Sequence, residues 1–113
     1  MHEYSIVQSL IDLVESSVAE HGAVSVHRLH LRLGDLSGVE RSLLETAYDA
    51  FRERTVCREA ALEIHPVPVR WACPRCNDEI GPGTLLRCPR CELPARLAEG
   101  DEIVLDRIEM EVN

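Results

Sequence analysis

The stretch CPRCNDEIGPGTLLRCPRC, residues 73–91, decides how this chain can fold. It contains the same C-P-R-C motif twice, with eleven residues between the two copies. A C-x-x-C turn places two sulfur atoms on one side of a tight bend. Two such turns that face each other supply the four sulfurs of a tetrahedral Zn²⁺ site, each about 2.3 Å from the ion. We therefore predict a zinc site formed by Cys73, Cys76, Cys88 and Cys91.

The predicted zinc site is structural, because four thiolates fill the shell of the ion and leave no position for water or substrate. A segment of this size has almost no core, so metal binding worth on the order of 10 kcal/mol would supply its folding energy. A thioredoxin-like redox pair is the alternative, but no βαβ pattern precedes the first motif. The fifth cysteine, Cys57, stands apart and is expected to be a small buried hydrophobic residue.

Strand-like sequence lies on both sides of the cysteine-containing segment. Ala61–Val69 alternates apolar and polar residues before it, and Pro66 and Pro68 restrict the far end of that strand to a sheet edge or an exit. Glu102–Val112 is the strand expected after it. The segment therefore reads as an insertion. We predict an α/β domain of residues 1–66 plus 103–113 and an inserted zinc-binding domain of residues 67–102.

The first third of the chain changes its hydrophobic period at a glycine. Apolar residues recur at helical spacing from Ser5 to His21, and Gly22 ends that pattern. A period of two follows, in which Leu29, Leu31 and Leu33 point to one face of a half-buried strand. The pattern predicts a helix that starts almost at residue one and is followed directly by a strand.

A second helix is predicted from about Val39 or Ser42 to Arg54. Ser42 and Glu45 have the spacing of a capping box, which favours a helix start at Ser42. The buried face of this helix is expected to consist of Leu43, Leu44, Ala47, Tyr48 and Phe51.

Composition narrows the classes of partner. The chain has 113 residues and a formal net charge of −8, which allows one domain with a small module and disfavours nucleic acid or an anionic membrane as a partner. It shows no apolar run long enough for a membrane span and no secretory signal, so a cytoplasmic protein is expected. No triad, phosphate loop or carboxylate pair suggests an enzyme.

The first three residues, Met1-His2-Glu3, form a candidate metal site of another kind. An α-amino group with a pKa of about 8 can lose its proton to a metal near neutral pH. The His2 imidazole, the amide nitrogen between these groups, and the amide nitrogen or carboxylate of Glu3 would complete a tetragonal set of donors that suits Ni²⁺ or Cu²⁺. A terminal His-Glu pair is more often simply solvated, so this site depends on the rest of the pattern.

Four segments together resemble the HypA/HybF family of hydrogenase nickel-incorporation proteins over nearly the full length. They are the start MHEYSIVQSLIDLVE, the segment LRLGDLSGVE, the two CPRC motifs and the tail EGDEIVLDRIEMEV. The resemblance implies a two-layer α/β domain of two helices on a small three-stranded mixed sheet, with a zinc-ribbon module inserted before the last strand. It implies a metallochaperone that carries nickel to the large subunit of NiFe hydrogenase, and in some organisms toward urease, with the GTPase HypB as a partner.

The resemblance also implies which residues bind nickel. In that family the ion is held by the retained N-terminal methionine and the two residues after it, which correspond to Met1, His2 and Glu3. Some members add an acidic residue early in the second helix, and the matching position is Glu40. Some relatives have histidines beside the zinc cysteines, but no histidine follows His65 in this chain. The histidines at positions 21, 27, 30 and 65 are expected to be surface or packing residues.

Two other functions compete with the nickel carrier. A non-catalytic zinc-ribbon adaptor would bind a protein partner through its acidic surface or an edge strand, and it would not depend on a free amino terminus. A thiol oxidoreductase would have a redox-active C-x-x-C and would hold no zinc tightly.

Overall fold

The computed structural model describes residues 2–81, 83 and 85–113, and the chain divides into two compact units. The first unit comprises Met1–Arg32, Val39–His65 and Val104–Asn113. The second comprises Leu33–Gly38 and Pro66–Ile103. Within the described part of the chain, no helix has the length and hydropathy needed to cross a membrane.

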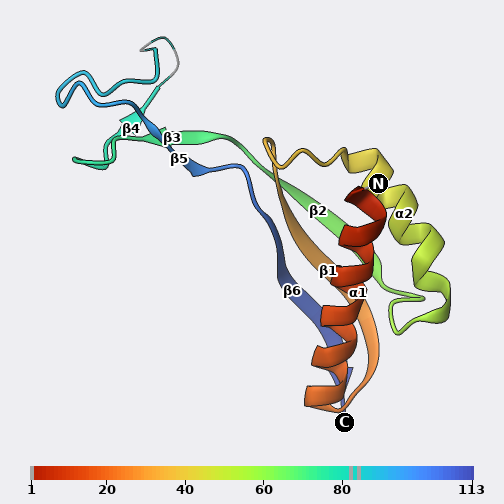
Figure 1. Ribbon diagram of the computed structural model, residues 1–113. Coiled ribbons are helices and arrows are strands. Elements are labelled where there is room, and N and C mark those ends of the chain that lie inside the picture. The colour runs from red at the N-terminus through yellow and green to blue at the C-terminus, as the bar shows by residue number, and fades with distance from the viewer. Residues whose placement is uncertain (1, 82, 84) are drawn as a thin grey trace. The chain divides into compact units, whose positions relative to one another are not determined.

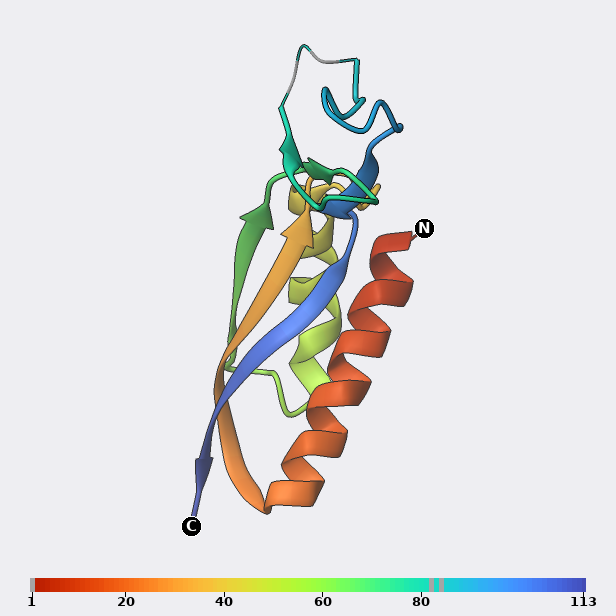
Figure 2. The ribbon, with the colours of Figure 1, turned by 90° about the vertical axis from the view of Figure 1, so that its left-hand side faces the viewer.

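The first unit is built on a mixed three-stranded sheet. Its strands, β1 (Ala23–Gly34), β2 (Ala61–Val67) and β6 (Ile103–Val112), lie in the order β2-β1-β6. Figure 2 shows the arrowheads of β1 and β2 pointing the same way and that of β6 pointing the opposite way. With the helices α1 (His2–His21) and α2 (Arg41–Phe51), this arrangement confirms the predicted fold class.

Both helices cover the same face of the sheet (Figure 1, Figure 2). The core therefore lies between the helical layer and one side of the strands, where each element contributes its apolar side chains. The other side of the sheet presents charged and polar groups that contact one another across the strands, including Arg28, His30, Glu63 and Glu109. Buried core residues of this unit include Val7, Leu10, Ile11, Val14, Val26, Leu29, Leu31, Leu44, Ala47, Tyr48 and Ile64.

The first helix begins almost at the first residue, as the sequence pattern predicts. Its first turn includes His2 and Glu3, ahead of the apolar stripe. The helix ends at His21, and Gly22 follows with a φ of 64°, which is the left-handed conformation that ends many helices. The chain is therefore helical almost from its first residue.

The second helix starts at Arg41, between the two predicted starts, but its predicted capping box and part of its predicted buried face are wrong. The residue that caps α2 is Glu40, so Ser42 lies inside the helix and does not form a capping box with Glu45. Leu43 and Phe51 are 55% and 40% exposed, although both fit the helical spacing of the buried face. After Phe51 the chain continues as a 3-10 helix, Arg52–Arg54, which accounts for the predicted end of the helix. Cys57 is fully buried, as expected, and burial raises the pKa of its thiol.

The second unit contains a small antiparallel sheet in the order β4-β3-β5. These strands are β3 (Arg70–Ala72), β4 (Glu79–Ile80) and β5 (Arg96–Glu99). They place Trp71 and Ile80 opposite each other and against the cysteines. Cys73, Ile80 and Cys88 are the buried residues of this cluster, so the cysteines themselves form most of its core.

Candidate metal centres

The two C-P-R-C motifs fold into the same local structure, which we call a knuckle. In the first, the amide of Asn77 donates to the carbonyl oxygen of Cys73 at 3.0 Å. In the second, the amide of Glu92 donates to the carbonyl oxygen of Cys88 at 2.9 Å. Both donor residues adopt left-handed backbone conformations, with φ values of 63° and 58°. Asparagine is common in the left-handed conformation, but glutamate is not. The residue types after the two motifs therefore did not indicate that both turns end in the same way.

Backbone amides in each knuckle point at a sulfur atom. The amides of Arg75 and Cys76 lie 3.4 and 3.5 Å from the Cys73 sulfur, and the amide of Cys91 lies 3.4 Å from the Cys88 sulfur. Donation from the Cys76 amide, followed by that from Arg75, lowers the pKa of the Cys73 thiol to about 6. The thiolate is the form that binds a metal, so this sulfur is prepared for coordination.

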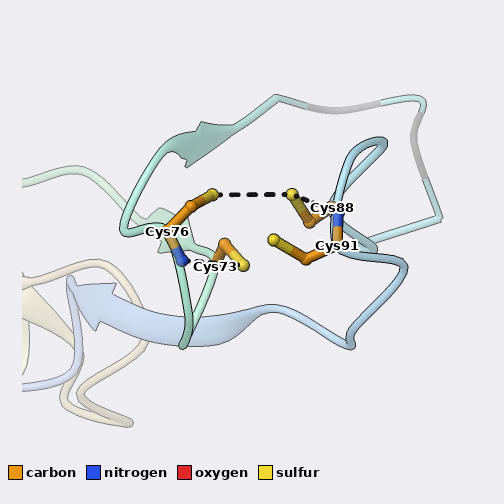
Figure 3. Close-up of side chains that lie close together, drawn as sticks. All are labelled: Cys73, Cys76, Cys88 and Cys91. Atoms are coloured by element: carbon orange, nitrogen blue, oxygen red, sulfur yellow. Dashed lines mark hydrogen bonds between the residues drawn. The ribbon is translucent and has the colours of Figure 1, made fainter.

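The four cysteine sulfurs converge from the two knuckles, as Figure 3 shows. All four lie within 4.8 Å of one another, and the sulfurs of Cys76 and Cys88 are 3.7 Å apart. Four sulfurs at about 2.3 Å from one ion in a tetrahedron are about 3.8 Å apart, so the spacing fits a thiolate-bound metal ion such as Zn²⁺. The structure therefore brings together the four cysteines selected from the sequence.

Charges around the knuckles are partly balanced by arginine. The guanidinium of Arg90 pairs with the carboxylate of Asp78, and contact with the Cys76 sulfur and with Asp78 raises the pKa of Arg90. Burial raises the pKa of the Cys91 thiol to about 12. This thiol keeps its proton without a metal, because four neighbouring thiolates would repel one another in a buried site. Binding of a cation would remove that obstacle.

The predicted nickel ligands at the amino terminus are only partly described. Met1 lies outside the described residues, and His2 is described as the first residue of α1 without its side chain. Glu3 lies in the first turn of the helix and is half-buried. The structure thus gives the backbone conformation of His2 and Glu3.

Glu40, the fourth predicted nickel contact, is engaged as the cap of α2. Its carboxylate accepts hydrogen bonds from the Leu43 amide at 3.1 Å, the Ser42 amide at 3.4 Å, and the Ser42 hydroxyl. These bonds, above all the one from the Ser42 hydroxyl, hold the pKa of Glu40 below its ordinary value. An ion bound by both oxygens would displace cap interactions, so the local structure explains Glu40 without a metal.

Comparison with known proteins places the chain in a family. Residues 1–110 match the family described as "Hydrogenase/urease nickel incorporation, metallochaperone, hypA". A hydrogenase maturation factor HypA from Shewanella baltica is 38% identical over 114 residues, which cover 98% of this chain and 97% of the relative. The HypA of Aquifex aeolicus is 38% identical over 115 residues and is covered, like this chain, to 100%.

Solved structures agree with the sequence comparison. The solution structure of the Ni metallochaperone HypA from Helicobacter pylori matches with a TM-score of 0.75 and 31% identity, covering 98% of both chains. A second solution structure of a HypA protein matches with a TM-score of 0.84 and 32% identity, covering 100% of this chain and 98% of the other. This chain belongs to the HypA family of hydrogenase/urease nickel-incorporation metallochaperones.

Proposed function

We propose that this chain binds one Ni²⁺ ion through the Met1 amine, His2 and Glu3, and delivers it to the large subunit of NiFe hydrogenase. The observation that supports this most directly is the start of α1 at His2, because His2 and Glu3 then belong to the first turn of a helix. The Helicobacter pylori relative is described as a Ni metallochaperone, which supports nickel as the ion. The family description also includes urease, so urease maturation is a second proposed destination.

The end of a helix suits a ligand set that uses backbone nitrogen. The first four amide groups of an α-helix have no carbonyl partner within the helix, so coordination through the amides of His2 and Glu3 would break no helical hydrogen bond. The amine, the His2 amide and the His2 imidazole close small chelate rings around one ion, a planar arrangement that suits Ni²⁺.

The same position keeps binding weak enough for transfer. The positive end of the helix dipole opposes a cation by about 0.3–1 kcal/mol, and the Glu3 carboxylate in the first turn offsets part of this. A terminal site can exchange its ligands one at a time with an acceptor, without unfolding of the carrier. Both features favour an ion that is held specifically and released readily.

Packing below the terminus holds this site in place. Val7 and Leu10 are buried one and two turns into α1, and the ring of Tyr4 meets the ring of Phe51 edge to face, with centroids 5.2 Å apart. These contacts anchor the first two turns of α1. One of them joins α1 to α2, because Phe51 is the last residue of α2. The proposed ligands therefore extend from a fixed support.

We further propose that Cys73, Cys76, Cys88 and Cys91 hold a structural Zn²⁺ ion, which the sulfur spacing supports. When bound, zinc would cross-link the two knuckles and offset half of the negative charge of their four thiolates. In this proposal the zinc module is a scaffold, and the GTPase HypB and the hydrogenase large subunit are the protein partners.

Nickel titration of the untagged, zinc-loaded protein tests the nickel site. The expected result is a planar, nitrogen-rich Ni²⁺ absorption band that saturates when one ion per chain has bound at the terminus, and that is lost in His2→Ala and when residues are added before Met1. The control is His27→Ala, which removes an exposed histidine of β1. Nickel bound among the thiols, seen as sulfur-to-nickel charge transfer, or a spectrum unchanged by His2→Ala would refute the site.

Delivery requires a second experiment. Nickel-loaded wild-type protein, mixed with HypB, GTP and nickel-free hydrogenase large subunit, should insert nickel into the large subunit. His2→Ala should not, while its zinc content stays at the wild-type level. Equal insertion by the two proteins would show that the terminus does not carry the delivered ion.

A further inference from the structure

The face of the sheet that the helices leave uncovered contains a cluster of two histidines and two carboxylates. His30 comes from β1, Glu63 and His65 from β2, and Glu109 from β6. All four residues belong to the first unit. His30 is only 7% exposed, although its strand neighbours Arg28 and Arg32 on this face are exposed. Its imidazole is therefore enclosed by the side chains of the cluster.

Three side chains of this cluster, those of His30, His65 and Glu63, form a triangle whose ligand atoms have the spacing of a metal site. Nδ1 of His30 lies 3.0 Å from Nε2 of His65. Two oxygens of Glu63 complete the triangle, one 3.9 Å from Nδ1 of His30 and the other 3.9 Å from Nε2 of His65. Ligand atoms at about 2.0–2.1 Å from one tetrahedral ion are about 3.3–3.4 Å apart, so an ion needs only shifts of a few tenths of an ångström.

The two histidine nitrogens face each other because of strand register. β1 and β2 run parallel, and the imidazoles of His30 and His65 stack across them with centroids 5.3 Å apart and planes 9° from parallel. Without a metal, a single proton shared in a hydrogen bond between Nδ1 of His30 and Nε2 of His65 accounts for their 3.0 Å separation. A divalent ion would replace that proton and bind both lone pairs, since neutral imidazole is the ligand form.

Glu109 orients His30 as a metal ligand. Its carboxylate oxygen lies 2.5 Å from Nε2 of His30, on the side of the ring opposite His65. In the tautomer whose Nε2 proton is donated to this carboxylate, the lone pair of Nδ1 is directed into the triangle. The arrangement of carboxylate, histidine and metal recurs in protein zinc sites, where the carboxylate fixes the tautomer and strengthens the ligand.

The surrounding charges limit which ions the cluster suits. Arg28 donates to one oxygen of Glu63 at 2.9 Å, and Arg107 lies 3.1 Å from Nε2 of His30 and 3.4 Å from the Glu109 carboxylate. These cations repel another cation and disfavour Mg²⁺ or Ca²⁺, which need several carboxylate oxygens. Two imidazoles and one carboxylate instead suit the later first-row transition metals.

We propose that His30, His65 and Glu63 form a binding site for one divalent late first-row transition-metal ion, with Zn²⁺ and Ni²⁺ as its representative occupants. Its ligands are Nδ1 of His30, Nε2 of His65 and a carboxylate oxygen of Glu63, and water completes the shell. Glu109 is a positioning residue. The site is separate from the cysteine centre and from the amino terminus, and it stands whether or not nickel binds at Met1-His2-Glu3.

The test uses the full chain with its cysteine centre already loaded with zinc, in a His2→Ala background that removes the proposed terminal site. Calorimetric titration with Zn²⁺, and separately with Ni²⁺, should find one further ion per chain. His65→Ala should weaken this binding at least about 100-fold, and Glu109→Gln should weaken it about 10- to 100-fold, the usual effect of losing a partner of a metal-bound histidine. His27→Ala, on the same strand as His30 and paired with Glu111 at 3.2 Å, is the matched control and should bind normally.

Nitrogen chemical shifts of the imidazoles supply a readout that a purely structural histidine pair would not give. Added Zn²⁺ should shift Nδ1 of His30 and Nε2 of His65 while leaving the ring of His27 unchanged. If His65→Ala perturbs the fold, Glu63→Gln provides the second variant, because that side chain is 42% exposed, and it must also weaken binding. The absence of a further ion, or equal binding by the His65→Ala and His27→Ala variants, would overturn the proposal.

Discussion

The carbonyl oxygen of Gly100 occupies the space that a Cβ atom at Gly34 would need. No side chain fits there, so the two backbones meet directly in the second unit. The contact is reinforced by hydrogen bonds from the Leu36 amide to the Gly100 carbonyl at 2.6 Å and from the Gly34 amide to the Glu102 carbonyl at 2.9 Å. Gly100 itself has a φ of 109°, which only glycine adopts without strain.

Replacement of Gly34 by alanine is expected to destabilise the second unit. The added methyl must displace backbone atoms, which costs about 1–3 kcal/mol in a closely packed region. Trp71, the one tryptophan of the chain, lies in β3 of that unit, so its fluorescence during urea unfolding measures the effect. Gly81→Ala is the control, because no atom lies within 4 Å of its added Cβ. Equal unfolding midpoints for the two variants would contradict the close approach.

Two adjacent leucines of α2 are expected to differ sharply. Leu44 is fully buried, and Leu44→Ala should lower the free energy of unfolding by about 2–5 kcal/mol, because it leaves a cavity in the core. Leu43 is 55% exposed, so Leu43→Ala should change that free energy by less than about 0.5 kcal/mol. Urea unfolding followed by far-ultraviolet circular dichroism measures both. Similar losses of unfolding free energy in the two variants would contradict this orientation of α2 about its helix axis.

Removal of the metal from the cysteine centre should unfold the second unit and leave the helices in place. Cysteines form most of the buried cluster of that unit, while α1 and α2 belong to the first unit with its own apolar core. Excess chelator under reducing conditions, or Cys88→Ser, should change the fluorescence of Trp71 and leave most of the helical circular dichroism. Cys57→Ser, at the cysteine outside the cluster, is the control for metal content. Retained Trp71 fluorescence after complete metal loss would show that the module folds without metal.

The cap of α2 should weaken in acid. Hydrogen bonds from the Ser42 hydroxyl and the Leu43 amide hold the pKa of Glu40 below its ordinary value of 4.5. Its contribution to stability is therefore fully present above about pH 4.5 and is lost as the pH falls through the lower folded-state pKa. The difference in unfolding midpoint between wild type and Glu40→Gln should shrink over that range.

A matched variant separates the cap from general acid effects, which include protonation of the cysteine ligands. Glu45→Gln changes a carboxylate on the same helix that lies 3.8 Å from Arg41 in an exposed pair. Its difference from wild type should stay small at every pH, because exposed pairs contribute little. A cap role for Glu40 also predicts unchanged nickel affinity in Glu40→Gln. A large loss of nickel affinity would instead support the contact implied by family resemblance.

Local patterns predicted the elements of this fold well. The alternation of Leu29, Leu31 and Leu33 and the helical stripe after Ser5 gave a strand and a helix where the structure has them. Periodicity does not resolve the rotation of a short helix, however. Leu43 and Leu44 both fit one apolar stripe, and only packing against α1 and the sheet decides which is buried.

The cap of α2 shows a second limit. Ser42 and Glu45 have favourable spacing, yet the capping residue is Glu40, two residues before Ser42, and its side chain accepts from the amides of Ser42 and Leu43. Both arrangements satisfy helix-end amides, so the sequence alone does not choose between them. The incoming path of the chain selects the residue that remains extended, which is Glu40 with a φ of −87° and a ψ of 122°.

The sequence by itself determined the four clustered cysteines, the amphipathic helices and the family. Each of these depends on the spacing of residues within a short segment or on the order of segments along the chain. Only the tertiary structure decided that His30 meets His65, 35 residues away, and Glu109, 79 residues away. The physical reason is that hydrophobic period specifies which face of a strand is buried but not which strand lies beside it. Strand order and register bring these polar groups together, and neither can be read from residues that are individually ordinary.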